Sequence, residues 1–275
     1  MRSSRTAALV TAVAVAGALA AGCGTGDGGS LVDKSSLTIG VKPDQPGLGF
    51  RSRAGVFEGF DVDVARYVAR RLGFADKDIT FVATPSSVRE QALREGRVDM
   101  ILASYSITAS RKTQVTFAGP YYVAHQDTLV RADDDTVRNV RDLHGRRLCK
   151  VTGSNSWRRV TEERGVAARL VETPSYSACV DRLVDGTVDA VSTDDLILAG
   201  FAAARGAAVK IINAPISDEK YGVGLPKGDL DGCEEVNRAL TEMYQDGTAE
   251  RLLREWFGRT TLRTTTTVPQ FEGCA

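Results

Sequence analysis

The chain has 275 residues, of which 43% are hydrophobic and 25% are charged. This composition is typical of a globular protein of one or two domains with enough apolar residues for a sizeable core. Lysine plus arginine and aspartate plus glutamate both number 35. Nothing in that balance indicates a protein that binds nucleic acid or a membrane surface.

The N-terminus has the pattern of an export signal. Arg2 and Arg5 precede an apolar run over residues 7–21 that is too short to cross a membrane. The sequence Leu-Ala-Ala-Gly then leads to Cys23 and resembles a bacterial lipobox, although its leucine lies four residues before the cysteine instead of the usual three. We expect residues 1–22 to be a lipoprotein signal peptide, and residues 23–34 to be a lipidated cysteine with a flexible Gly/Ser-rich tether. Plain secretion with an unpaired cysteine is the alternative.

The cysteines beyond the signal number four: Cys149, Cys179, Cys233 and Cys274. An even number in an exported chain indicates disulfides, and three pairings exist. We favour Cys149–Cys179 and Cys233–Cys274, because they join neighbours in sequence; each would stabilise the fold by roughly 3–4 kcal/mol. The sequence has no C-x-x-C pair, and its two histidines are not spaced as ligands. We therefore expect no metal and no cofactor.

The first half of the chain alternates strands and helices. Apolar periodicity predicts strands at 36–41, 79–83 and 99–105, and helices within 59–73 and 86–95. This order indicates a parallel sheet covered by helices.

Two features of this half concern a ligand site or could be mistaken for one. The Pro/Gly-rich segment 42–49 is predicted to be a loop at the carboxyl end of a strand, where α/β folds place ligands, so Lys42 is a candidate site cation. Asp61 and Asp63 stand at the start of a helix, and we interpret them as capping and dipole-compensating residues, not as paired catalytic carboxylates.

The stretch 99–111 is the first candidate binding segment. It begins apolar, becomes rich in hydroxyl groups, including Ser104 and Ser106, and ends at Arg111. A guanidinium matches a carboxylate with two hydrogen bonds, and hydroxyl and N–H groups complete the oxygen shell. The pattern favours a small carboxylate ligand; a plain strand, a Ser/Thr turn and a surface arginine are the alternative.

The second half predicts another α/β unit. After short strands at 115–117 and 127–131, we expect strands at 148–151, 169–173, 189–195, 208–213 and 220–226, and helices from 157, at 175–185 and over 230–257. The turn 152–156, with Thr152 and Asn155, offers N–H groups to an anion, or is an ordinary N-cap turn. The phrase Gly-x-Val-Asp occurs at 96–99 and again at 186–189, which indicates two similar lobes.

The two halves together suit a zwitterion. Arg111 would take a carboxylate and Asp194, at the end of a predicted strand, an ammonium. Each charge of the ligand, once buried, needs such a partner.

The run 59–72 resembles the signature of bacterial extracellular solute-binding protein family 3, the amino-acid-binding proteins of ABC importers. The resemblance extends from about residue 37 to 257. Segment 103–108 with Arg111 is similar to the family's α-carboxylate segment, 151–155 to its second-lobe turn, and Asp194 to its ammonium-binding aspartate. Residues 42–47, with the placement of Cys149 and Cys179, look like the glutamate-binding branch found in actinobacteria.

This resemblance implies an α/β, periplasmic-binding-protein-like fold with two α/β lobes joined by a two-strand hinge. Lobe 1 would comprise residues 35–125 plus 217–275, and lobe 2 residues 126–216, with crossings near 123–127 and 217–221. The ligand would lie in the cleft and stabilise the closed form. The implied ligand-binding residues are Ser104, Ser106, Arg111, Thr152, Asn155 and Asp194.

Side-chain specificity rests on a second cation. Lys42 and Arg89 are the candidates for a distal carboxylate, and Arg51 is a weaker one. Glutamine would instead need a neutral pair that includes Gln45 or Gln126. We expect glutamate, with aspartate and glutamine as alternatives.

We therefore expect an extracytoplasmic, lipid-anchored, monomeric lipoprotein whose partners are a free amino acid and the transmembrane subunits of an ABC permease, with no nucleic acid. A sensor lipoprotein that signals to a membrane kinase system is one alternative. A cyclic-acid dehydratase on the same fold is another, but neither His125 nor His144 falls in a predicted site segment and no Ser/His/Asp triad assembles. We expect no enzymatic activity.

Overall fold

The computed structural model describes residues 29–274. The predicted signal peptide and Cys23 lie outside the described residues. Among residues 29–274, none of the helices combines the length and the apolar character that a membrane span requires.

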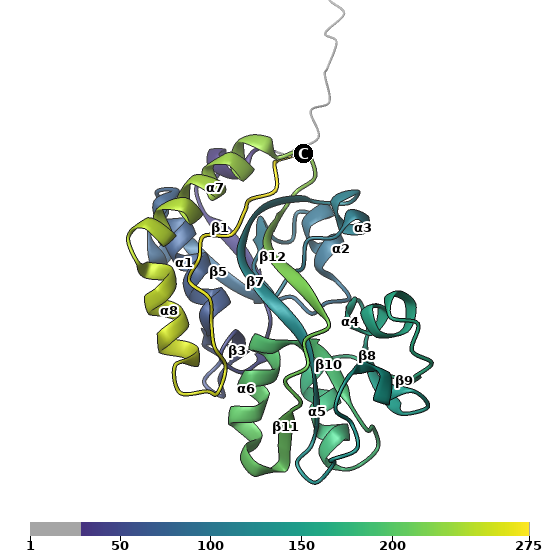
Figure 1. Cartoon of the computed structure of the whole chain (residues 1–275). Coiled ribbons are helices and arrows are strands. Elements are labelled where there is room, and N and C mark those ends of the chain that lie inside the picture. Colours follow the sequence, from purple (N-terminus) through teal and green to yellow (C-terminus); the bar gives the residue numbers. More distant parts are fainter. Residues whose placement is uncertain (1–28, 275) are drawn as a thin grey trace, which may run out of the picture.

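A seven-stranded mixed sheet runs through the molecule (Figure 1). Its order is β10-β7-β12-β6-β1-β5, and β11 also pairs with β7. Parallel pairs join β1 to β5 and to β6, whereas β12 runs antiparallel to β6 and β7. The strands are β1 (Leu37–Val41), β5 (Ile79–Ala83), β6 (Met100–Ile101), β7 (Thr116–Arg131), β10 (Val191–Asp194), β11 (Val209–Ile211) and β12 (Ser217–Leu225).

Helices pack around this sheet in two lobes, so the predicted α/β class is confirmed. The first lobe contains α1 (Phe60–Arg71), α2 (Arg89–Arg94), α3 (Ala109–Lys112), α7 (Leu230–Gln245) and α8 (Thr248–Phe257). The second contains α4 (Ser156–Arg158), the π-helical turn η4 (Arg159–Glu163), α5 (Tyr176–Val184) and α6 (Asp195–Arg205). The 3-10 turns are η1 (Leu31–Asp33), η2 (Asp76–Asp78), η3 (Val140–Leu143) and η5 (Gly206–Ala208).

Two smaller sheets complete the fold. In the second lobe β8 (Arg147–Val151) and β9 (Arg169–Thr173) form a parallel pair. In the first lobe β2 (Asp44–Gln45), β3 (Gly49–Arg51) and β4 (Phe57–Glu58) form an antiparallel sheet. The prediction of a plain loop over 42–49 is therefore wrong, because the segment folds back and pairs with itself.

Strand β7 replaces the two short strands predicted at 115–117 and 127–131. It is one strand of 16 residues, buried along nearly its whole length. A proline interrupts a sheet ladder because it has no N–H group. Here Pro120 falls within the irregularity of pairing between Tyr221 and Val223 of β12, so the ladder continues on both sides of it.

The two predicted crossing segments lie against each other. Ser217 of β12 pairs with Gln126 of β7, and Lys220 pairs with Val123. Residues 126–129 of β7 pair with β10, and residues 129–131 pair with β11, both of the second lobe. The two strands thus pass side by side between the lobes (Figure 1).

The predicted strand 99–105 is shortened to Met100–Ile101. The chain turns at Ser104, whose φ of +43° lies in the left-handed region that is rare outside glycine. Apolar side chains still alternate here: Met100 and Leu102 belong to the main core with α1, α7 and α8, whereas Ile101 belongs to a smaller core under α2. The predicted helix from residue 157 begins instead at Ser156 and becomes π-helical at Arg159.

The aspartate of the repeated Gly-x-Val-Asp motif makes the same kind of hydrogen bond in both lobes. The carboxylate of Asp99 accepts the Thr38 N–H at 2.7 Å, at the start of β1. The carboxylate of Asp189 accepts the Arg147 N–H at 2.8 Å, at the start of β8. Each aspartate thus ties one strand of its lobe to the next.

Both favoured cysteine pairings are confirmed. Cys149 and Cys179 form a disulfide that joins β8 to α5, with 5.8 Å between their Cα atoms. Cys233 of α7 bonds to Cys274, with 5.9 Å between their Cα atoms, and this holds the C-terminal segment against the first lobe.

Candidate functional site

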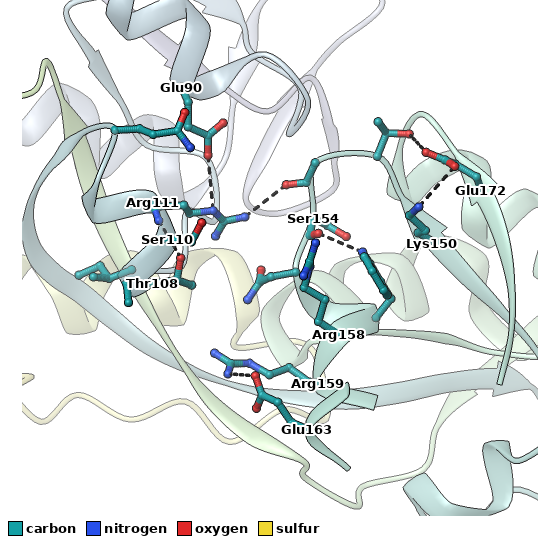
Figure 2. Close-up of a pocket in the computed structure, with 17 residues that line it drawn as sticks. Glu90, Thr108, Ser110, Arg111, Lys150, Ser154, Arg158, Arg159, Glu163 and Glu172 are labelled. Carbon is teal, nitrogen blue, oxygen red and sulfur yellow. Dashed lines mark hydrogen bonds and ion pairs between the residues drawn. The ribbon is translucent and has the colours of Figure 1, made fainter. Parts of the chain in front are cut away.

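A cleft of about 850 Å³ opens between the lobes (Figure 2). On the first-lobe side it is lined by Glu90 and by residues 107–111 at α3. On the second-lobe side it is lined by the turn 152–155 and by Trp157. The cleft therefore joins the two segments in which the sequence places an anion site.

Arg111 lines the cleft and makes hydrogen bonds to both lobes. Its N–H is bonded to the Thr108 hydroxyl, which caps α3. Its guanidinium donates to the Ser106 carbonyl at 2.8 Å and lies 3.5 Å from the Glu90 carboxylate. Nη2 crosses to the Gly153 carbonyl of the second lobe at 3.3 Å (Figure 2). Burial, together with the nearby Arg89, lowers the pKa of Arg111 to about 10, which leaves it charged at neutral pH.

Three cationic side chains are buried together in the first lobe. Lys42 is 3% exposed, Arg89 is 2% exposed and Arg111 is 7% exposed. The Tyr105 ring lies under both guanidinium groups, 4.1 Å from Arg89 and 5.0 Å from Arg111. Arg89 donates to the Ala103 carbonyl at 3.1 Å. Its Nε has no hydrogen-bond partner within residues 29–274.

Lys42 shows how strongly this cluster favours an anion. Its Nζ donates to the Ser86 hydroxyl. Burial, and then repulsion from Arg89, lowers the pKa of Lys42 from 10.5 to about 7, against an opposing contribution from Asp44. A substantial fraction of the Lys42 side chains is therefore neutral near pH 7, and a neighbouring anion would restore their charge.

Ser104 is bonded to the buried carboxylate of Asp61, which we expected from the sequence to cap a helix. The Ser104 N–H donates to Asp61 at 2.8 Å, and the Tyr121 hydroxyl donates to the same carboxylate at 2.8 Å. The capping interpretation of Asp61 is wrong, because the cap of α1 is Gly59, with no side-chain bond. Burial raises the pKa of Asp61 to about 6. The sequence does indicate that Asp61 is buried, because it lies on the apolar face of α1 with the buried residues 64, 65 and 68.

Asp194 supplies the second lobe's charge. It ends β10 and is 4% exposed, and it accepts the hydroxyl of Tyr221 at 2.8 Å. Tyr221 in turn pairs with Ser106 across an isolated bridge, so the hinge strand β12 joins the carboxylate to the Arg111 segment. Burial, and then the nearby Glu219 carboxylate, raises the pKa of Asp194 well above 3.8, while Arg111 opposes the shift.

Residues 37–259 match the model of the bacterial extracellular solute-binding proteins, family 3. The chain belongs to this family. It is 39% identical over 269 residues to the glutamate-binding protein GluB of Corynebacterium glutamicum, covering 93% of this chain and 91% of that one. It is 30% identical to the ABC transporter glutamine-binding protein GlnH of Bacillus subtilis, covering 82% and 83% of the two chains.

Solved structures agree with this membership. An ancestral arginine-binding protein bound to arginine matches with a TM-score of 0.75 and 31% identity, over 82% of this chain and 99% of that one. An ancestral amino acid-binding protein described as a precursor of cyclohexadienyl dehydratase matches with a TM-score of 0.74 and 28% identity, over 83% and 100%. The predicted periplasmic-binding-protein-like fold is thereby confirmed.

Some of the ligand-binding residues predicted for this solute-binding protein do not contact the buried Lys42, Arg89 and Arg111. Thr152 is exposed and donates to Glu172 at 2.9 Å. Asn155 donates to Glu219 at 3.3 Å. The group of this turn that meets Arg111 is the Gly153 carbonyl, which no side-chain argument could identify.

Two further candidates for specificity also lie elsewhere. Arg51 is exposed and lies 5.5 Å from the Phe57 ring centre, on the small sheet. Gln126 is fully buried and donates to the Ser156 carbonyl at 2.9 Å and to the Ser192 hydroxyl at 2.8 Å. In the part of the chain that the structure describes, no cluster of three His, Cys, Asp or Glu residues is placed to hold a metal ion.

Proposed function

We propose that this protein binds glutamate between its lobes and delivers it to the permease of an ABC importer. The supporting observation is the arrangement of charge: three buried cations in the first lobe, Lys42, Arg89 and Arg111, and the buried Asp194 carboxylate in the second. A buried charge without a partner is strongly destabilising, so this cluster favours an anionic ligand.

The amino-acid end of the ligand would use one charge from each lobe. Arg111 would give its bidentate donors to the α-carboxylate, and Asp194 would accept from the α-ammonium. Because these two groups meet only when the lobes are closed, the ligand binds the closed form more tightly than the open one. We propose that lobe 1 (35–125 plus 217–275) and lobe 2 (126–216) close about the segments 123–127 and 217–221.

The distal carboxylate would take Lys42 and Arg89. Two buried donors near these residues lack partners within residues 29–274: Nε of Arg89 and Nε2 of Gln45, whose Oε1 already accepts from Ser104 at 2.9 Å. Free donors suit a carboxylate better than an amide, which also requires an acceptor. The name of the 39% identical relative, a glutamate-binding protein, supports the same choice.

We further propose that the protein binds its ligand without transforming it. His125 is exposed and lies 2.8 Å from Asp218 on the hinge strands, and His144 is exposed at the end of η3. Neither reaches the buried charges. We also propose that the chain is a monomer held outside the cell membrane by a lipid on Cys23, which C23S should release into the soluble fraction.

Calorimetric titration of the purified protein with glutamate, aspartate, glutamine and arginine tests the proposal. We expect the tightest binding with glutamate, and loss of all binding in Arg111→Ala. Tighter binding of arginine, or of no amino acid at all, would overturn it. Lys42→Ala should weaken glutamate far more than glutamine; an equal loss for both would reject the distal-carboxylate assignment.

A further inference from the structure

The lobes also touch away from the buried charges, through the segment between β1 and β3. The Asp44 carboxylate of the first lobe accepts the Ser177 N–H at 3.2 Å. Ser177 is in the first turn of α5, whose cap Ser175 already satisfies a different N–H, that of Ala178. The Asp44 carboxylate therefore accepts from one of the N–H groups at the N-terminal end of a second-lobe helix, where the positive end of the helix dipole stabilises a carboxylate.

A second contact lies two residues further along. A Cβ atom built on Gly200 of α6 would lie 1.9 Å from the carbonyl oxygen of Pro46. This distance is far inside van der Waals contact, so the backbones of the two lobes meet here and only glycine fits. In Figure 1 the small sheet containing β3 lies next to α6. Gln45, between the two contact points, is bonded to Ser104 of the candidate site.

We propose that residues 43–48 form a clasp, in which Asp44 and Pro46 hold α5 and α6 when the lobes close. In this mechanism, which rests on the proposed ligand-driven closure, the contacts of Asp44 and Pro46 set the affinity and lifetime of the closed form without touching the ligand. Its contacts exist only in the closed form, so they add the same free energy to the binding of every ligand. Asp44 and Gly200 are thus positioning residues, and neither determines specificity.

Gly200→Ala is the sharpest test, because two readouts should move in opposite directions. Alanine favours a helix over glycine, so the unliganded protein should melt no lower than the wild type. Closure, however, would force the new methyl group against Pro46. We expect affinities for glutamate and glutamine to fall together, by up to about a hundredfold. With glutamate at a concentration that closes the wild type but lies below the weakened affinity of the variant, small-angle scattering of the variant should show the dimensions of the unliganded protein.

Asp44→Ala is the second variant, measured at pH 5.5 to limit any change in the charge of Lys42, because Asp44 helps to raise the pKa of that lysine. Loss of one charged hydrogen bond should weaken both ligands about tenfold and speed dissociation. Asp185→Ala is the matched control, because Asp185 accepts the Thr187 N–H at 2.8 Å wholly within lobe 2. It should leave affinity unchanged.

The outcomes separate the clasp from the proposed function. If the wild type binds no amino acid, the proposed function fails. If the wild type binds glutamate and both variants bind it equally well, the clasp is wrong and the proposed function stands. A changed ratio of glutamate to glutamine affinity in Gly200→Ala would also reject the clasp, because it would mean that Gly200 acts on the ligand.

Discussion

The lowered pKa of Lys42 makes glutamate recognition dependent on pH. Its pKa of about 7 reflects burial first and Arg89 second. A distal carboxylate needs the charged lysine, so binding glutamate should draw a proton onto Lys42. The preference for glutamate should then be complete below pH 6 and fall as the pH rises through 7. With a pKa of about 7, the charged fraction of Lys42 falls about tenfold between pH 6 and pH 8.

Glutamine is the internal reference for this measurement. It shares the α-carboxylate and α-ammonium, so any titration of Asp194 affects both ligands alike and cancels in the ratio of their affinities. We expect the glutamate-to-glutamine affinity ratio to fall about tenfold from pH 6 to pH 8. Titrations at pH 7 in two buffers of different ionisation heat should show uptake of about half a proton more with glutamate than with glutamine. A ratio that stays constant over this range would refute the role of Lys42.

Three other outcomes follow from the structure. Arg89→Ala should raise the pKa of Lys42, since it removes a nearby positive charge, and should weaken glutamate more than glutamine; calorimetry at pH 6 and 8 checks both effects. Replacing Cys149 and Cys179 together by serine should lower the free energy of unfolding by about 3–4 kcal/mol in urea titrations, as expected for a loop closed over a separation of 30 residues. The pKa of Asp61 is raised by burial from 3.8 to about 6, so the wild type should lose about 2 kcal/mol of stability through this group as the pH rises from 4 to 6, and Asp61→Asn should lack that loss.

Periodic and short-range features were predictable from the sequence. The strand at 79–83 has the predicted bounds because it is a compact apolar run, and the strand at 169–173 also has them, although only Leu170 and Val171 in it are apolar. The two disulfides join neighbours in sequence as expected. Arg111 and Asp194, which the sequence places beside apolar segments, are both buried in the structure.

Long-range pairing was not predictable in the same way. Strand β7 contains Gly119 and Pro120, which argue locally for a break, yet pairing with β12 keeps the strand continuous. Asp61 carries the correct residue type for a helix cap, but its partners are Ser104 and Tyr121, far along the chain. Local propensity describes what a residue can do, whereas the fold determines which partner it meets.

Glutamate binding should change the protonation of Lys42 and Asp194 as well as the arrangement of the lobes. Burial favours the neutral form of Lys42 and the protonated form of Asp194. Both shifts reduce the buried charge that the site carries without a ligand. A bound glutamate would reverse both, because its distal carboxylate favours charged Lys42 and its ammonium favours charged Asp194. Restoring these charges therefore costs part of the binding free energy. A ligand that lacks the distal carboxylate or the ammonium does not make the interaction that offsets this cost.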